Sequence, residues 1–294
     1  MEDDMELSNL TLLNGDIFDV NALGVIALGS QGNAPFQSAL LHDFDRVVMI
    51  LHENGEENRL IDHMIAGEFR TQTLRVGLSM LERSIITGDN NERVTCLLEG
   101  EILWDPQGIL ERFRHEVIRF EQPLRERVLF VEFARFLHMH VKSKRYLQAG
   151  CYMDSYNCIL VALYHWARME VSEAGHYPMP AVWEQVKNLN NSVYKLYEEL
   201  TISGETMEQR IQLVQLACEF SLMSKMGDCC KWLLDLLRDR NEPSSIEELL
   251  CFPGLKDVEA ELPFVLRKLA SRALIKEMAS WADAGGRYPI RYTL

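Results

Sequence analysis

The chain has 294 residues, enough for two or three domains, and its 47% hydrophobic and 25% charged residues are typical of a soluble globular protein. Its net charge of −14 argues against a dedicated nucleic-acid binder, because such proteins neutralise phosphates with basic surfaces. No apolar run approaches the ~20 residues of a membrane-spanning helix, and the acidic start MEDDMELSNL is unlike a secretory signal. We therefore expect no membrane partner.

The seven cysteines indicate the compartment. They include no Cys-x-x-Cys pair and no zinc-site spacing. Scattered single thiols are typical of a reducing compartment, and the adjacent Cys229 and Cys230 are interpreted as packing residues. The sequence therefore predicts a cytoplasmic protein.

The first part of the chain alternates strand-like and helix-like segments, which predicts an α+β domain over residues 1–121. Ser79 and Glu82 have the spacing of a capping box at the start of one helix. The predicted strands are residues 22–28, 43–51, 71–77 and 101–105, and the predicted helices are residues 34–41, 56–66, 79–87 and 91–99.

Beyond Pro106 apolar residues recur at spacings of three and four, and glycines and prolines separate the segments. No convincing strand pattern is present in this part of the sequence. We therefore predict an all-helical domain over residues 122–240. The predicted helices are residues 106–121, 123–146, 150–174, 179–189, 191–203, 205–226 and 228–240.

Residues 241–294 form a third predicted unit, with a short helix at IEELL, a second helix at AELPFVLRKLASRALI and a strand at the end. This order is typical of a winged helix-turn-helix. From Pro243 onward, however, seven basic residues are matched by seven acidic ones, which is a poor charge for holding DNA. A packing or protein-contact module is the favoured interpretation.

Residues 29–50, GSQGNAPFQSALLHDFDRVVMI, combine a Gly-Ser turn with two carboxylates before an apolar run. Because residues two apart in a strand point to the same face, Asp43 and Asp45 are predicted to point together, away from Phe44. Paired carboxylates suit a divalent cation that carries a nucleoside triphosphate. A solvated carboxylate pair with no ligand is the plainer alternative.

A strand, a Gly-Ser turn, a short helix and an Asp-x-Asp strand in this order resemble the nucleotidyltransferase fold of the DNA polymerase β superfamily. The resemblance implies that Gly29 and Ser30 lie under the triphosphate and that Asp43 and Asp45 bind Mg²⁺. The 12 residues between Ser30 and Asp43 fit the loose spacing of that family. A turn of small residues lets backbone amides approach phosphate oxygens, and two metal ions activate the attacking hydroxyl.

The resemblance extends over nearly the whole chain. The later segments LYHWAR and YKLYEEL, followed by a small helix-turn-helix end, resemble the YgxA-like nucleotidyltransferase proteins of Bacillus-type bacteria. That likeness implies an architecture similar to aminoglycoside nucleotidyltransferases, in which a helical domain closes the cleft and contacts the acceptor.

The sequence departs from the superfamily pattern at the third carboxylate, which active members carry on a later strand. The candidate strand TQTLRVG has Arg75 where that acid is expected. Without it the site lacks either a base or a metal ligand. Four acids nearby are alternatives, and none is an obvious replacement: Glu68, Glu99, Glu101 and Asp105.

A polar stripe on the predicted helix 150–174 is a second candidate site. Its members share one helical face: Asp154, Asn157, Val161, His165 and Arg168. Such a stripe could line a cleft, with Arg168 as a nucleotide-binding residue and Asp154 and His165 near the substrate. The alternative is a structural network in which Arg168 bridges acids between helices.

The motif YKLYEEL is a third candidate, since Tyr197 and Glu198 could hold an aminated or sugar-like acceptor. An amphipathic packing face is the alternative. His138 and His140 are two apart on a predicted helix and therefore face apart, which argues against a metal site.

These residues predict transfer of a nucleoside monophosphate from an NTP to a hydroxyl of an unknown small-molecule or protein acceptor, with Mg²⁺ on Asp43 and Asp45. One alternative is a catalytically silent nucleotide-binding sensor or scaffold. Another is a DNA-binding regulator acting through residues 241–294, which the charge disfavours. Exposed aromatic surface on the helical half permits a homodimer.

Overall fold

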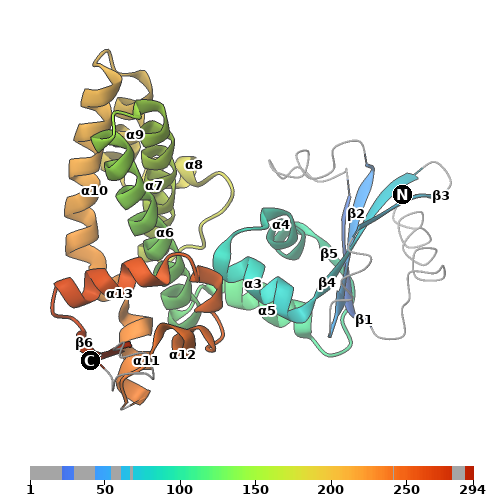
Figure 1. The fold of residues 1–294 in the computed structure, drawn as a ribbon. Coiled ribbons are helices and arrows are strands. Elements are labelled where there is room, and N and C mark those ends of the chain that lie inside the picture. Colours follow the sequence, from blue (N-terminus) through green and yellow to red (C-terminus); the bar gives the residue numbers. More distant parts are fainter. Residues whose placement is uncertain (1–21, 30–43, 54–60, 67–68, 241, 280–288) are drawn as a thin grey trace. The chain divides into compact units, whose positions relative to one another are not determined.

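The chain forms two compact units, residues 1–119 and 120–294, and each is described by itself. The first holds a mixed sheet with helices, and the second is helical with a small two-stranded sheet, so the predicted α+β class is confirmed (Figure 1). The structure is a computed structural model that describes residues 22–29, 44–53, 61–66, 69–240, 242–279 and 289–294.

The sheet of the first unit has five strands in the order β3-β4-β2-β1-β5. β2 pairs parallel with β4, and the other neighbouring pairs are antiparallel. The strands are β1 (Ala22–Gly29), β2 (Arg46–His52), β3 (Ile61–Ala66), β4 (Phe69–Gly77) and β5 (Glu101–Trp104).

β2 is the central strand, and its sequence explains why. Six successive residues, Val47 to His52, are buried. A strand that alternates apolar and polar residues can cover only one face of a sheet, whereas a continuous apolar run suits burial on both faces. The apolar run VVMIL therefore explains why β2 lies in the middle of the sheet.

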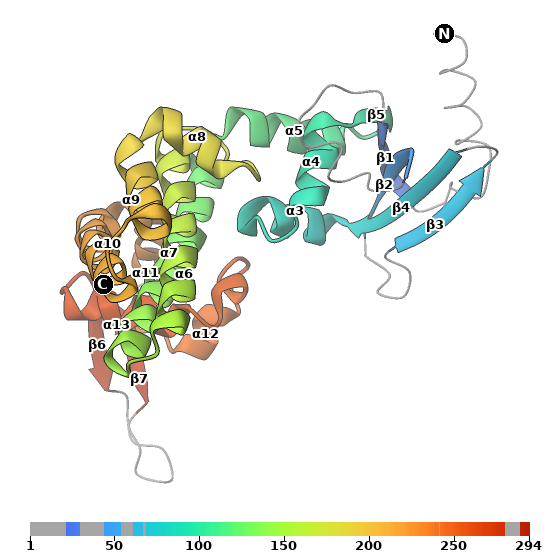
Figure 2. The same cartoon turned by 90° about the horizontal axis from the view of Figure 1, so that it is seen from above.

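Three helices pack against this sheet through one apolar side each: α3 (Leu78–Thr87), α4 (Asn91–Glu99) and α5 (Ile109–Arg119). Figures 1 and 2 both show them on the same side of the sheet. Leu81, Leu97 and Leu110 are fully buried in this layer. Burying one such side chain contributes roughly 1.5–3 kcal/mol.

Two predictions for the first unit are wrong. Residues 56–66 were expected to be helical, but Ile61–Ala66 form strand β3, since antiparallel pairing with β4 outweighs the helical spacing. The capping box at Ser79 is absent because β4 runs directly into α3, whose N-cap is Gly77 with no side-chain cap hydrogen bond. The predicted helix 34–41 lies outside the described residues.

The second unit is organised around two long neighbouring helices, α6 and α7, and α10 packs against both. All seven helices predicted after Pro106 are present, with boundaries shifted by a few residues. Those of the second unit are α6 (Gln122–Gln148), α7 (Tyr152–Glu173), α8 (Val182–Leu189), α9 (Asn191–Ile202), α10 (Met207–Cys229) and α11 (Lys231–Arg240).

Large aromatic side chains fill the core between these helices. Phe130, Phe133 and Phe136 on α6 are fully buried. Phe136 stacks on Trp166 of α7 with ring centroids 5.6 Å apart, and Phe130 packs against Trp232 of α11 at 5.2 Å. Such pairs add about 0.5–1.5 kcal/mol beyond burial.

The C-terminal segments belong to the same compact unit. The predicted helix to residue 275 ends at Ser271, and a strand that was not predicted follows it. Tyr292 of the last strand also bridges Ser244. The elements are α12 (Ile246–Leu250), the 3₁₀ helix η1 (Lys256–Val258), α13 (Leu262–Ser271), β6 (Lys276–Ala279) and β7 (Ile290–Thr293), with β6 and β7 antiparallel.

Candidate functional site

Three strand ends meet at one edge of the five-stranded sheet. Gly29, the last residue of β1, pairs with Arg46, the first residue of β2. Arg46 in turn pairs with Thr71 near the start of β4. Sheet pairing therefore brings Gly29 and the residues that begin β2, which are separate in sequence, to the same edge.

Asp45 immediately precedes β2, and its carboxylate is held in place at this edge. Asp45 Oδ2 accepts a 2.7 Å hydrogen bond from the backbone N–H of Arg70, and Asp45 N donates to Arg70 O at 2.9 Å. Burial lowers the pKa of the neighbouring Arg46, and the charge of Asp45 acts in the opposite direction. The half-buried carboxylate is thus fixed by the backbone of β4.

Gly29 is exposed, and a Cβ built on it would have no atom of the described residues within 4 Å. Its backbone does not adopt the left-handed conformation that favours glycine. Neither packing nor backbone geometry therefore requires a glycine here. Open space beside a strand end is what a close approach of phosphate to the backbone needs.

Ser30 and Asp43 lie outside the described residues, so the triphosphate-contacting hydroxyl and the first carboxylate stay predictions. Among the residues that the structure describes, no three His, Cys, Asp or Glu side chains lie close enough to hold a metal ion. Of the two predicted metal-binding carboxylates, Asp45 is the one that the structure describes.

The expected position of the third carboxylate needs correction. Arg75 pairs with Ile50, five residues along β2 from Asp45, and its guanidinium forms an ion pair with Asp62 of β3. The β4 residue beside Asp45 is Arg70. The prediction took Arg75 as the relevant position because the parallel register cannot be read from the sequence.

The alternative acids are placed as follows. Asp105 caps α5, since its two carboxylate oxygens accept the N–H groups of Ile109 and Glu111 at 2.8 and 3.0 Å. Glu101 begins β5, where it pairs with Ala27 of β1. Burial raises the pKa of Glu99 at the end of α4, and Glu68 lies outside the described residues.

Arg168 lies inside the helical unit with 2% of its surface exposed. Its Nε donates a 2.6 Å hydrogen bond to Glu132 of α6, and its Nη1 donates to the carbonyl of Pro178 at 3.2 Å. The arrangement is the interhelical network that the sequence left open as the alternative. A phosphate could reach this guanidinium only if the helices opened.

Glu132 joins two members of the predicted stripe, because its second oxygen lies 2.7 Å from His165 Nδ1. Burial by itself would raise the pKa of Glu132, but the charge of Arg168 and the bond to His165 lower it to about 2. Burial lowers the pKa of Arg168, but the negative charge of Glu132 outweighs this effect. The pKa of Arg168 is therefore raised above its ordinary value. Glu132 was not among the predicted site residues, although a single acid within the apolar run FVEFARF is a usable signal.

The remainder of the stripe is exposed: Asp154, Asn157 and Val161 lie on the surface near the start of α7. The structure therefore does not gather the five predicted residues into one site. The stripe runs from solvent at Asp154 to a buried network at Arg168.

Tyr197 lies in an aromatic cluster of α8 and α9, where its ring packs in a tilted arrangement against Trp183 with centroids 4.3 Å apart. Tyr194 is 6.4 Å from Tyr197, and the ammonium of Lys187 lies 5.3 Å from the Tyr194 ring. Glu198 is exposed. This is helix packing with a partly exposed aromatic edge.

The two histidines of HMH contact different elements, as their spacing predicts. His138 stacks on Phe264 of α13, and its Nδ1 lies 3.2 Å from Glu261 Oε1. His140 Nε2 lies 3.2 Å from the carbonyl oxygen of Gln215 on α10. Both side chains join helices.

In the part of the chain that the structure describes, no helix combines the length and the apolarity that crossing a bilayer requires.

Two family models match successive parts of the chain. The family described as "Nucleotidyltransferase-like" matches residues 14–127, and the family described as "YgxA-like substrate binding domain" matches residues 126–225. The uncharacterized protein YgxA of Bacillus subtilis is 28% identical over 87% of this chain and 85% of its own length.

A solved structure extends the comparison to the fold. The crystal structure of a nucleotidyltransferase-like protein from Exiguobacterium sibiricum matches with a TM-score of 0.84 and 26% identity, over 98% of this chain and 99% of that one. The two domain matches in the sequence and the similarity in fold therefore indicate the same kind of protein. The chain combines a nucleotidyltransferase-like domain with a YgxA-like substrate-binding domain, and it is similar to YgxA and to this solved structure over most of its length.

Proposed function

We propose that the protein transfers a nucleoside monophosphate from an NTP to a hydroxyl of a small-molecule or protein acceptor. The observation that carries this proposal is the sheet edge where Gly29 meets the start of β2 and the Asp45 carboxylate is fixed by Arg70 N–H. The match to a nucleotidyltransferase-like family supports the reaction class.

In this proposal Asp43 and Asp45 would hold Mg²⁺, which would supply positive charge to the triphosphate and lower the pKa of the acceptor hydroxyl. The chain's own residues position the reactants. The backbone of Gly29 and Ser30 contacts the triphosphate, and the hydrogen bond from Arg70 keeps the Asp45 carboxylate from rotating away. The acceptor would bind to the helical unit.

A silent nucleotide-binding sensor is the second candidate, and one observation favours it. The residue beside Asp45 on β4 is an arginine, so a third carboxylate is absent from that position. Such a site would bind the nucleotide without activating a hydroxyl.

The C-terminal elements support a contact module over a DNA reader. We propose a winged-helix-like arrangement for α12, α13 and the β6-β7 hairpin, with the Ser244–Tyr292 bridge as its third strand contact. In a winged helix that reads DNA, α13 would enter the major groove. Phe264 on this helix is instead packed against His138 of α6, so part of the α13 surface is already occupied. We place the protein in the cytoplasm, since all seven cysteines are free.

Thermal unfolding with ATP, CTP, GTP or UTP, with and without Mg²⁺, tests binding. A nucleotide at 100 times its Kd stabilises the folded chain by about 2.7 kcal/mol. Asp45→Asn keeps an oxygen for the Arg70 N–H but removes the charge, and it should weaken Mg²⁺-dependent binding at least about tenfold. Asp62→Asn on the same sheet is the matched control.

Release of pyrophosphate with a panel of hydroxylated acceptors separates the two candidates. An enzyme releases pyrophosphate and loses this activity in Asp45→Asn. Binding without release over the whole panel supports the sensor. No stabilisation by any of the four nucleotides would contradict both.

A further inference from the structure

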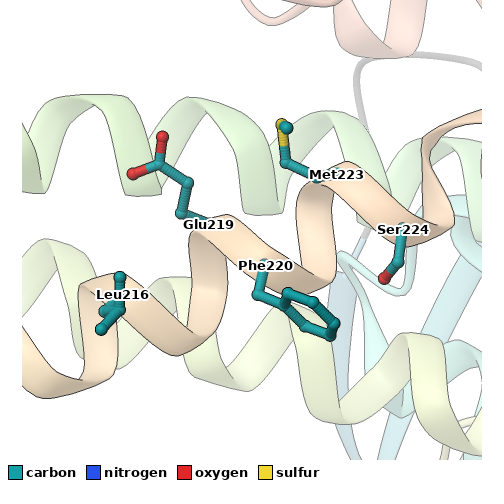
Figure 3. A pocket seen from close by; sticks show the side chains of 5 residues that line it. All are labelled: Leu216, Glu219, Phe220, Met223 and Ser224. Atoms are coloured by element: carbon teal, nitrogen blue, oxygen red, sulfur yellow. The ribbon is translucent and has the colours of Figure 1, made fainter.

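The outward face of α10 carries an apolar stripe that the nucleotide site does not use. Leu216 and Phe220 are 70% and 77% exposed, and Leu213 and Met223 are also exposed. Figure 3 shows Leu216, Phe220 and Met223 following one another along this single helix, beside a shallow hollow of about 460 Å³. Large apolar side chains gathered on one face mark an interaction surface more often than chance exposure does.

The stripe contains no charged residue, although the whole chain has a net charge of −14. Six residues share the face over 19 residues of helix, and none is charged: Gln209, Leu213, Leu216, Phe220, Met223 and Gly227. Glu219 at the rim is neutralised by Lys144 of α6 at 2.8 Å. An approaching surface of the same net charge therefore meets no unpaired acid along the stripe.

The stripe is complementary to itself in the antiparallel direction. Residue numbers on this face pair symmetrically about position 218, so that Leu216 meets Phe220 of a second copy and Leu213 meets Met223. The same register sets Gln209 against Gly227, which offers no side chain to obstruct it. A two-fold axis requires this property, since one patch must match itself.

Both ends of the stripe carry charged residues. Arg272 of α13 contacts the sulfur of Met223 near the C-terminal end of α10, and Glu208 lies at the N-terminal end. Antiparallel pairing brings the Arg272 end of one copy to the Glu208 end of the other, and it also sets Glu208 level with the exposed Asp228. In a parallel pairing Arg272 would meet Arg272 and Glu208 would meet Glu208, so Arg272 gains an acidic neighbour only in the antiparallel register.

From these observations we propose that α10 is a homodimer interface in which two copies pair antiparallel around residue 218. The four apolar side chains expose on the order of 400 Å² per copy, so the pair buries about 800–1,000 Å², at the low end of specific interfaces. The dimer is accordingly weak, with a Kd of about 1–100 μM.

Sedimentation equilibrium of the full chain from about 1 to about 200 μM tests the proposal, because a weak interface dissociates within this range. Phe220→Glu and Leu216→Lys should each raise the dimer Kd more than about tenfold, since each buries a charge against an apolar side chain. Both positions are exposed, so neither substitution disturbs the core. Ile202→Glu on α9 is the matched control, since Ile202 is also 77% exposed, and it should leave the Kd unchanged.

Mixing the two variants tests the register. In the mixed dimer the lysine introduced at position 216 of one copy faces the glutamate introduced at position 220 of the other. The unchanged Phe220 and Leu216 meet at the symmetry-related contact. An equimolar mixture should therefore recover the dimer that each variant loses alone. The proposal is overturned by a wild-type chain that stays monomeric at about 200 μM, by a dimer that survives Phe220→Glu, or by a mixture that stays monomeric.

Discussion

Asp45 and Arg168 show how one sequence rule leads to two different environments. Both are charged residues chosen because they share a face with other polar residues. Asp45 is half-buried at a sheet edge beside an exposed glycine, where a ligand can approach. Arg168 is enclosed between α6 and α7 and matched by Glu132, which the sequence analysis did not consider. Burial, which decides between the two roles, depends on the packing partner.

The buried pair gives a stability prediction. Arg168→Met leaves the fully buried Glu132 carboxylate without its main counter-charge and should lower the free energy of unfolding by about 3–5 kcal/mol. Arg112→Met is the control, because its pair with Glu116 is exposed and 3.8 Å long, and it should cost about 0–1 kcal/mol. Urea unfolding measures both. Equal losses in the two variants would show that burial of the pair is not the cause.

His140 gives a pH prediction. Burial lowers its pKa from 6.5 to about 4 in the folded state. The unfolded chain therefore binds a proton at a higher pH than the folded chain, and stability falls as the pH drops from about 6.5 to about 4. The loss is on the order of 1–3 kcal/mol.

A substitution isolates this contribution. His140→Gln keeps an N–H donor for the carbonyl of Gln215 but does not titrate. Urea unfolding at pH 7 and pH 5 should show a smaller pH dependence in the variant. An unchanged difference between the two pH values would assign the acid sensitivity to other groups.

At the scale of elements, helix starts show where local sequence is sufficient. The capping box of α10, formed by Thr206 and Gln209, is present and lies after an irregular segment. The similar spacing at Ser79 and Glu82 forms no cap, because β4 continues into α3 without a break. A capping residue stabilises a helix only where the chain enters it in a non-helical conformation.

This difference predicts unequal effects for two similar changes. Thr206→Ala should destabilise the chain by about 1 kcal/mol, since it leaves the N–H of Gln209 without its acceptor. Ser79→Ala should have an effect near zero or slightly favourable, because alanine is the better helix former inside α3. Unfolding midpoints measure both changes. A larger loss for Ser79→Ala would contradict the cap assignment.

At the scale of the whole molecule, the proposed nucleotide site and the proposed dimer interface lie in different units. The sheet edge lies in the first unit, and the helical unit carries the buried network and the α10 stripe. Because the two features lie in different units, separate substitutions test nucleotide binding and dimerisation in the full chain.

Hydrogen–deuterium exchange locates the nucleotide. With Mg²⁺ and the nucleotide that stabilises the chain most, exchange should slow at the end of β1 and the starts of β2 and β4, including the N–H of Arg70. α10 amides should not respond at a protein concentration below the dimer Kd. Protection confined to the helical unit would place the nucleotide site elsewhere.

The sequence alone determined the class of most elements, because apolar periodicity and glycine or proline boundaries act within a few residues. The order of Gly29-Ser30 and Asp43-x-Asp45 between two predicted strands also indicated the resemblance to nucleotidyltransferases. Tertiary structure decided the rest. The parallel register moved Arg75 away from Asp45, strand pairing made Ile61–Ala66 a strand, and helix packing enclosed Arg168. These three outcomes depend on partners distant in the chain, which local patterns do not specify.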